Sequence, residues 1–233
     1  MRSIFATSAV VIGLGLPGVT MAQELSLSAG ATLTSRYVFN GIEQTTGAAF
    51  QPWAEAEYEG FYAGVWASNT ARSIVGSSVE VDLYLGYRNE VGRFSYDLGY
   101  TRYYYRNPSN DCCGEVILSL GYSVLDPLDV GLRFAHDPVA DYVNSSVSID
   151  YALDDKFGAS ANYGTISNGG HDYWSVGGSY AISDNFGIDA SWHDTSISDG
   201  LLIVSLTTAV LHRSTATQSA PYPRRNSGGT FKA

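Results

Sequence analysis

Hydrophobic and polar residues alternate along most of this chain with a period of two. In the segment 79–88, odd positions hold valine, leucine and tyrosine, whereas even positions hold glutamate, aspartate, tyrosine, glycine and arginine. Segments 94–101, 128–135, 146–153 and 186–192 repeat the pattern. Successive side chains of a strand point to opposite faces, so this alternation predicts strands with one apolar and one polar face.

Counting such segments predicts an all-β fold of about twelve strands. We expect them at 25–39, 48–58, 61–68, 78–88, 94–105, 114–124, 128–135, 143–153, 157–164, 173–182, 186–193 and 201–211. Short turns alternate with longer polar connections, which is typical of a closed antiparallel transmembrane β-barrel with short periplasmic turns and longer extracellular loops. The alternative is a soluble β-sandwich or a lipocalin-like barrel.

The polar faces favour the membrane barrel. They are rich in Gly, Ser, Asp and Glu, so they cannot fill a dry core at the density of a protein interior. They fit a water-filled lumen, with the apolar faces turned to lipid. Aromatic residues also gather at both strand ends, as membrane interfaces favour. Those expected at the interface beside the long loops are Tyr37, Phe39, Tyr103, Tyr104, Phe134, Trp174 and Trp192.

The beginning and the end of the chain differ from this pattern. A basic start, an apolar run over 4–16 and small residues before Ala22 predict a signal peptide at 1–22, cleaved on export. The barrel is expected over 23–211, in a bacterial outer membrane. The segment 212–233, rich in Ser, Pro, Thr and Arg, predicts a disordered or atypical tail. Adjacent Cys112 and Cys113 predict a vicinal disulfide or a pair of loop thiols.

Three segments carry a family resemblance. LTSRYVFNGIEQTTG (33–47), GFYAGVWASNT (60–70) and EVDLYLGYRNEVGRFSYDLGY (80–100) resemble the TorF-type porins, a bacterial family of unknown function, and the likeness extends over about 32–210. The resemblance implies an outer-membrane channel without an established substrate or catalytic residue. Such barrels meet the barrel-assembly machinery through a final strand that ends in an aromatic residue, whereas this chain continues into its tail.

If the lumen is wet, its charges govern what passes. The alternation places nine acidic residues inside: Glu55, Glu57, Glu80, Asp82, Asp97, Glu115, Asp129, Asp150 and Asp189. The basic residues expected there are Arg36, Arg88, Arg133 and Lys156. This excess of acid predicts a narrow, cation-leaning pore for small polar or ionic solutes. The alternative is that these charges pair across strands and only solvate the interior.

Other function classes have weaker support. The formal charge of −10 excludes a nucleic-acid partner, because no basic face can meet phosphates. His136, His171 and His193 each precede an aspartate and are weak metal candidates, so we expect no metal or cofactor. No nucleophile motif indicates an enzyme. A non-conducting surface barrel for adhesion and an outer-membrane lipid-modifying enzyme stay as alternatives.

Lipid is the remaining expected partner. A barrel in the outer membrane contacts its lipid and lipopolysaccharide. Arg102 interrupts the apolar face of its strand, between Tyr100 and Tyr104. Its guanidinium either meets a lipopolysaccharide phosphate or extends toward water.

Overall fold

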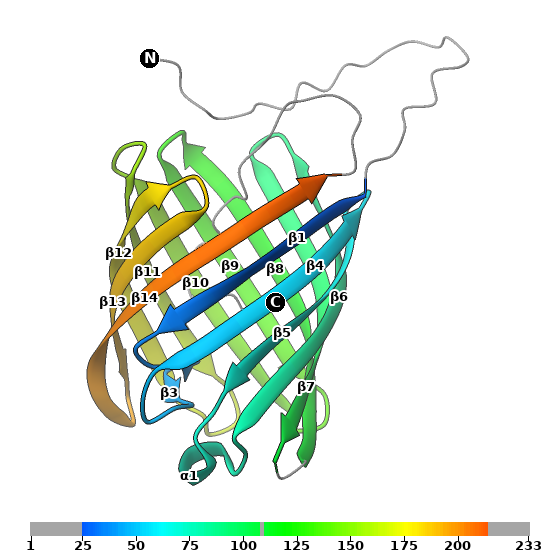
Figure 1. The fold of residues 1–233 in the computed structure, drawn as a ribbon, viewed down its shortest axis with the longest axis vertical. Coiled ribbons are helices and arrows are strands. Elements are labelled where there is room, and N and C mark those ends of the chain that lie inside the picture. The colour runs from blue at the N-terminus through cyan, green and yellow to red at the C-terminus, as the bar shows by residue number, and fades with distance from the viewer. Residues whose placement is uncertain (1–24, 108–109, 214–233) are drawn as a thin grey trace.

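The computed structural model describes residues 25–107 and 110–213, and these form a closed antiparallel barrel of twelve strands (Figure 1). Each strand pairs with its neighbours in sequence, and the first strand pairs with the last. The barrel strands are β1 (Ser26–Thr34), β4 (Ala49–Tyr58), β5 (Phe61–Asn69), β6 (Val79–Val91), β7 (Phe94–Arg106), β8 (Asn110–Leu125), β9 (Leu128–Asp137), β10 (Tyr142–Ala152), β11 (Phe157–Ile166), β12 (Asp172–Ser183), β13 (Phe186–Thr195) and β14 (Ser198–Arg213). The predicted fold class is confirmed.

The two ends of the barrel differ in their connections. At one end, called the turn end, the connections are 59–60, 92–93, 126–127, 153–156 and 184–185, and β1 begins and β14 ends there. The opposite end, called the mouth, carries the connections 35–48 and 70–78. The later mouth connections 138–141, 167–171 and 196–197 are shorter than the sequence predicts, because β9, β11, β12, β13 and β14 extend into the expected loops.

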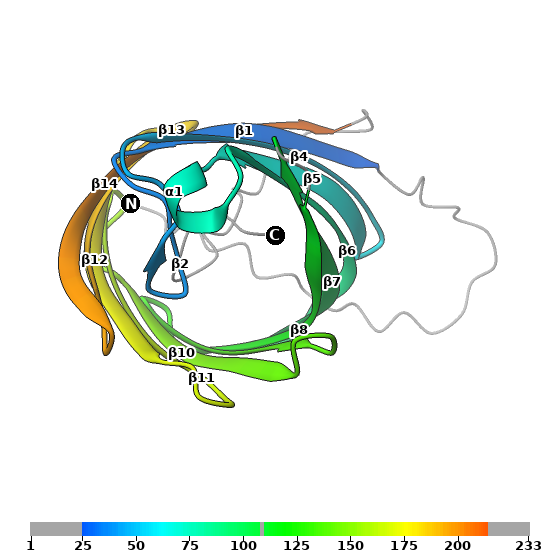
Figure 2. The ribbon, with the colours of Figure 1, turned by 90° about the horizontal axis from the view of Figure 1, so that it is seen from below.

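The first long connection corrects the predicted first strand. β1 ends at Thr34 rather than at Phe39, and the chain then forms a small hairpin of β2 (Val38–Phe39) and β3 (Ile42–Glu43). The second long connection contains the short helix α1 (Arg72–Val75). Seen toward the mouth, β2 and α1 lie within the outline of the ring of strands (Figure 2).

Exposure along the strands shows which face is inside. On β6, Leu83 and Leu85 are 49% and 59% exposed, whereas Glu80 and Asp82 are fully buried. The other strands likewise carry large apolar side chains on their outer faces, among them Phe61 and Val176. The apolar faces therefore point outward and the polar faces inward, which excludes a soluble sandwich built around an apolar core.

Several sequence predictions concern the ends of the chain. The predicted signal peptide at 1–22 and the tail from 214 onward lie outside the described residues. β14 continues to Arg213, two residues into the segment predicted as tail. Cys113 is disulfide-bonded, whereas the side chain of Cys112 lies outside the described part of the chain. Among the described residues, no helix is both long and apolar enough to cross a membrane.

A valine at Gly30 tests the close packing at the seam between β1 and β14. Its Cβ would lie 2.3 Å from the carbonyl oxygen of Thr208 and 2.8 Å from Nε1 of Trp53. We expect Gly30→Val to lower the free energy of unfolding by about 1–3 kcal/mol, the usual cost of overpacking. Urea unfolding of the refolded barrel, followed by heat-modifiable gel mobility, measures this. Gly178→Val is the control, because its Cβ would meet nothing closer than 3.6 Å. Equal stability of the two variants would contradict the described seam.

Candidate functional site: the barrel interior and its mouth

An ion-pair cluster occupies the interior near the turn end. Arg88 of β6 donates hydrogen bonds to Glu55 and Glu57, which occupy alternate positions of β4. The guanidinium of Arg88 also lies 4.7 Å from the ring centroid of Tyr62. The hydroxyl of Tyr62 donates to Asp97 of β7 at 2.6 Å. One arginine thus faces three carboxylates on neighbouring strands, so this layer keeps a net negative charge.

A second acidic layer lies closer to the mouth, around Glu115 of β8. Glu115 is fully buried and accepts hydrogen bonds from the hydroxyls of Tyr103 at 2.6 Å and Tyr142 at 2.9 Å. Nη2 of Arg133 lies 3.7 Å from its Oε2. Hydrogen bonds from two hydroxyls and one nearby guanidinium therefore keep this buried carboxylate in place.

Two further carboxylates belong to this mouth layer. Glu80 and Asp82 of β6 are fully buried, and they pair in register with Tyr105 and Tyr103 of β7. The hydroxyl of Tyr105 donates to Glu80 at 3.3 Å. Together with Glu115, they form the mouth acid cluster, defined as Glu80, Asp82 and Glu115.

The opposite interior wall carries small polar side chains. Tyr173 of β12 is buried and donates to Asn144 of β10 at 2.8 Å, which fixes which face of each strand is inside. Counting alternate positions from these two, the inner faces of β10 to β13 include Ser146, Ser148, Ser160, Asn162, Ser175, Ser179 and Ser191. Because small residues occupy less of the lumen than the aromatic and charged wall of β4 to β8, the interior is asymmetric.

The β2–β3 hairpin packs against the aromatic wall at its base. Tyr37, fully buried, contacts Trp66 of β5 edge-on with ring centroids 5.5 Å apart. The ring centroid of Phe39 lies 6.2 Å from that of Tyr103 of β7. The amide of Tyr37 donates to Oγ1 of Thr45 at 2.9 Å, which closes the base of the hairpin. This hairpin is therefore part of the packed interior.

The tip of the hairpin reaches the opposite wall. Asn40 and Gly41 form its turn with positive φ angles of 50° and 82°. A Cβ on Gly41 would lie 2.6 Å from Cβ of Tyr173 and 3.2 Å from Cβ of Thr195. His171 places Nε2 2.6 Å from the carbonyl oxygen of Asn40. The hairpin thus contacts β5 and β7 through its aromatic side chains and β12 and β13 at its tip, and β2 lies inside the ring of strands (Figure 2).

These positions correct part of the predicted aromatic belt. Tyr37, Phe39 and Tyr103 were expected at the lipid interface and lie inside instead. For Tyr37 and Phe39 the reason is the turn that folds the first connection into the lumen. Tyr103 has the same strand parity as Asp97 and faces inward with it. The members on the outer face toward the mouth are Tyr104, Phe134, Trp174 and Trp192. Their place at a lipid interface stays a prediction.

Other predicted interior charges lie as follows. Arg36 is on the first connection and pairs with Glu43 at 3.1 Å. Asp129 accepts a hydrogen bond from Ser123 at 2.6 Å near the turn end. Asp150 and Asp189 occupy inner positions of β10 and β13, opposite the ion-pair cluster. Lys156 does not line the interior, because it lies in a turn over the ring of Tyr180, which is on the outer face.

Some interior residues were missed by the sequence prediction. Asp137 is fully buried and accepts from the amides of Val139 and Ala140, although the sequence placed it in a loop. Gln51 and Asn144 are also buried. The signal for all three was available, since each shares the parity of an inward-facing residue on its strand.

The three histidines do not come together. His136 is exposed on the outer face of β9, His171 meets the hairpin, and Nε2 of His193 lies 3.0 Å from Oγ of Ser191 in the interior. Over the described residues 25–107 and 110–213, no group of three or more His, Cys, Asp or Glu side chains is arranged to hold a metal ion.

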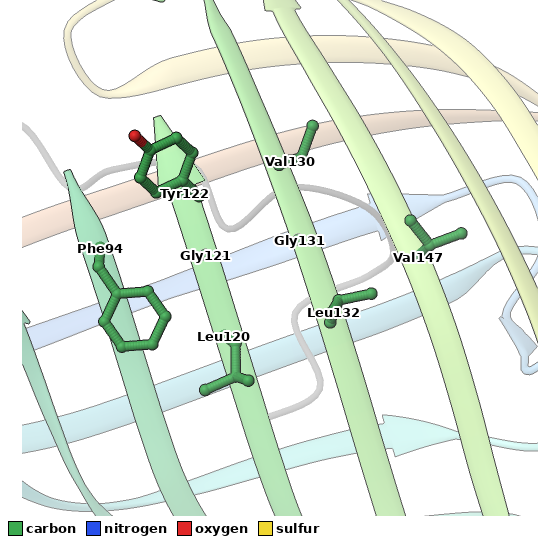
Figure 3. A pocket seen from close by; sticks show the side chains of 8 residues that line it. All are labelled: Phe94, Leu120, Gly121, Tyr122, Val130, Gly131, Leu132 and Val147. Carbon is green, nitrogen blue, oxygen red and sulfur yellow. The ribbon is translucent and has the colours of Figure 1, made fainter. Parts of the chain in front are cut away.

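A groove on the outer wall offers a different environment. Its volume is about 300 Å³, and it lies over β7 to β10 (Figure 3). The lining residues are Phe94, Leu120, Gly121, Tyr122, Val130, Gly131, Leu132 and Val147. The paired Gly121 and Gly131 contribute only backbone to this groove, because their Cβ positions face the lumen, toward Ser95 and Ser148. An apolar surface of this kind suits acyl chains and offers nothing to a polar solute.

Comparisons with known proteins agree with the fold. A family model described as "Bacterial protein of unknown function (Gcw_chp)" matches residues 19–218. That description does not carry the TorF name, so this part of the sequence resemblance is not confirmed. A comparison with curated proteins finds no match.

Solved structures of a porin share the barrel. The KdgM porin is 12% identical with a TM-score of 0.56, and the alignment covers 82% of this chain and 99% of that chain. A KdgM porin in complex with disordered oligogalacturonate is 11% identical with a TM-score of 0.53 and the same coverage. At such identities the likeness shows the fold.

Removing the Trp66 ring, which contacts Tyr37, tests whether this contact holds the hairpin in the mouth. Loss of a large buried aromatic side chain costs about 3–5 kcal/mol of packing. In Trp66→Ala we therefore expect the hairpin to open and trypsin to cleave after Arg36 at least about tenfold faster, because local opening becomes populated. Trp192→Ala, which removes an outer-face indole, is the control and keeps the original rate. A rate unchanged by Trp66→Ala would show that the hairpin does not depend on this contact.

Proposed function

This chain belongs to the Gcw_chp family of bacterial proteins of unknown function, and we propose that it is a narrow outer-membrane channel for small polar or ionic solutes, with a preference for cations. The observation that carries the proposal is the mouth acid cluster of Glu80, Asp82 and Glu115, buried inside a barrel whose outer face is apolar.

The charge of the interior supports cation preference. Near the turn end Arg88 faces Glu55, Glu57 and Asp97, and near the mouth Arg133 approaches Glu115. The acidic side chains outnumber these two arginines in both layers. A low-dielectric wall concentrates the field of such charges in the lumen. This field lowers the free energy of a cation there and raises that of an anion.

The size of the barrel and the hairpin support a narrow passage. Twelve strands lie between eight-stranded barrels filled by side chains and the wide barrels of sixteen or more strands. The β2–β3 hairpin crosses the mouth and reduces the opening further. We therefore propose passage of ions and small polar molecules rather than of long saccharides.

We do not propose oligogalacturonate, the ligand of the KdgM complex, as a solute of this chain. Oligogalacturonate carries a carboxylate on each sugar unit, and the acidic layers described above would repel it. The shared fold supports a channel, and the interior charge supports solutes of the opposite sign.

A non-conducting barrel is the second candidate, and the hairpin is the observation that favours it. If the tip at Gly41 seals the mouth against Tyr173, the barrel would serve at the surface without conducting. A lipid-modifying enzyme has less support, because Ser191 and His193 face the interior, away from lipid on the outer wall.

Ion selectivity tests the proposal. In planar bilayers with a salt gradient we expect a cation-selective reversal potential for the unaltered protein. In Glu80→Gln/Asp82→Asn the ratio of cation to anion permeability should fall by about threefold or more, because two focused charges are removed. The control Glu90→Gln/Asp155→Asn removes two exposed carboxylates at the turn end and should leave the ratio unchanged.

Two results would contradict the channel. Anion selectivity of the unaltered protein would refute the cation preference. No conductance from a barrel that shows heat-modifiable mobility would refute transport and favour the non-conducting barrel.

A further inference from the structure

Two arginines interrupt the outer face of β7 near the mouth. Counting outward positions from Leu98, the face continues with Tyr100, Arg102, Tyr104 and Arg106. The guanidinium carbons of Arg102 and Arg106 lie 5.8 and 5.3 Å from the ring centroid of Tyr104. One ring thus holds a cation on either side, where a lipid-facing strand would ordinarily carry apolar residues.

An apolar groove lies directly beside these cations. On β6 the outward residues Val79, Val81 and Leu83 pair in register with Arg106, Tyr104 and Arg102. Val81, Leu83, Tyr104 and Arg106 line a groove of about 350 Å³. The same few residues of the outer wall therefore form an apolar groove with a positive charge at its edge.

On its other side, Arg102 neighbours a strand position that has no side chain of its own. Its partner on β8 is Gly114, and a Cβ there would lie 2.3 Å from the hydroxyl of Tyr100. The side chain of Tyr100 therefore covers the outer face of Gly114 next to Arg102. Among the described side chains, Arg102 forms no ion pair with an acidic residue.

A third arginine reaches the same corner of the mouth. Arg72 of α1 donates from Nη2 to the carbonyl oxygen of Asn107 at 2.7 Å and to its Oδ1 at 2.9 Å. Asn107 directly follows Arg106, so Arg72 adds positive charge above the end of β7.

The turn end presents its cations differently. Nη1 of Arg93 donates to the backbone oxygens of Ser123 and Val124, at 3.4 and 2.7 Å. Lys156 lies over the ring of Tyr180. These side chains are spread over separate turns, whereas the mouth gathers three arginines around one strand end.

We propose that this corner binds a phosphorylated, multiply acylated glycolipid of the outer leaflet, the lipid A part of lipopolysaccharide. Guanidinium groups bind phosphate oxygens through paired hydrogen bonds, and Arg102 and Arg106 supply two of them. An acyl chain of the same molecule lies in the groove along Val81 and Leu83. The proposal shares with the proposed function only the location in the outer membrane, and it takes the mouth as the extracellular end because the longer connections of such barrels are extracellular.

A binding titration tests the site. The full-length barrel in detergent is titrated with a fluorescent diphosphorylated lipid A, with its dephosphorylated form and with phosphatidylglycerol. In Arg102→Gln/Arg106→Gln the dissociation constant for the diphosphorylated lipid should rise at least about tenfold, as expected for the loss of charge-assisted phosphate bonds. Arg93→Gln/Lys156→Gln loses the same charge at the turn end and should bind as tightly as the unaltered protein. The dephosphorylated lipid should not distinguish the two variants.

The outcomes separate this site from the channel. Equal affinity of the two variants would overturn the site, and so would phosphatidylglycerol that binds as tightly as lipid A. Conductance is recorded on the same preparations, and heat-modifiable mobility shows that each variant is folded. Arginine-dependent lipid binding by a barrel without conductance would leave the site intact and refute only the channel.

Discussion

The pairing of every strand in a closed ring is the constraint on which the rest of this structure depends. A bilayer offers no water to backbone amides and carbonyls, so a spanning sheet must satisfy them between its own strands. β1 meets this requirement with β14, from Ser26 paired with Arg213 to Thr34 paired with Ser205. Once the ring is closed, each strand has one face toward lipid and one toward the lumen. The apolar exterior and the acidic interior both follow from this geometry.

The interior then has to be filled unevenly. Aromatic and charged side chains crowd the wall of β4 to β8, and small polar ones line β10 to β13. The β2–β3 hairpin occupies the space that this asymmetry leaves, since it packs Tyr37 on Trp66 and reaches Tyr173 with its tip. The passage that we propose is therefore bounded by the acidic wall, the small-residue wall and the hairpin. The same asymmetry explains why selectivity should depend on residues of β6 and β8.

Alternation of side chains made the barrel and the inward carboxylates of β6 predictable from sequence, because the period of a strand is local. It failed where the parity or the path of the chain depended on distant contacts. Tyr37 and Phe39 continue the alternating pattern of β1, yet the bend at 35–36 directs them into a lumen that exists only after the ring closes. Tyr103 was assigned to a belt by its neighbours in an aromatic run, against the parity of its own strand. Asp137 has the parity of the inward-facing residues of β9, but the sequence does not show that β9 extends this far, because its end is fixed by pairing with β10.

The fluorescence of the four tryptophans reports directly whether the apolar faces meet lipid and the polar faces enclose water. Trp53 and Trp66 lie on inner faces, and Trp174 and Trp192 on outer faces. Two double Trp→Phe variants, each keeping one pair, are reconstituted in vesicles that contain brominated acyl chains. We expect strong quenching of fluorescence from Trp174 and Trp192 and little from Trp53 and Trp66. Strong quenching of the Trp53 and Trp66 pair, with the other pair unaffected, would contradict this orientation of the faces.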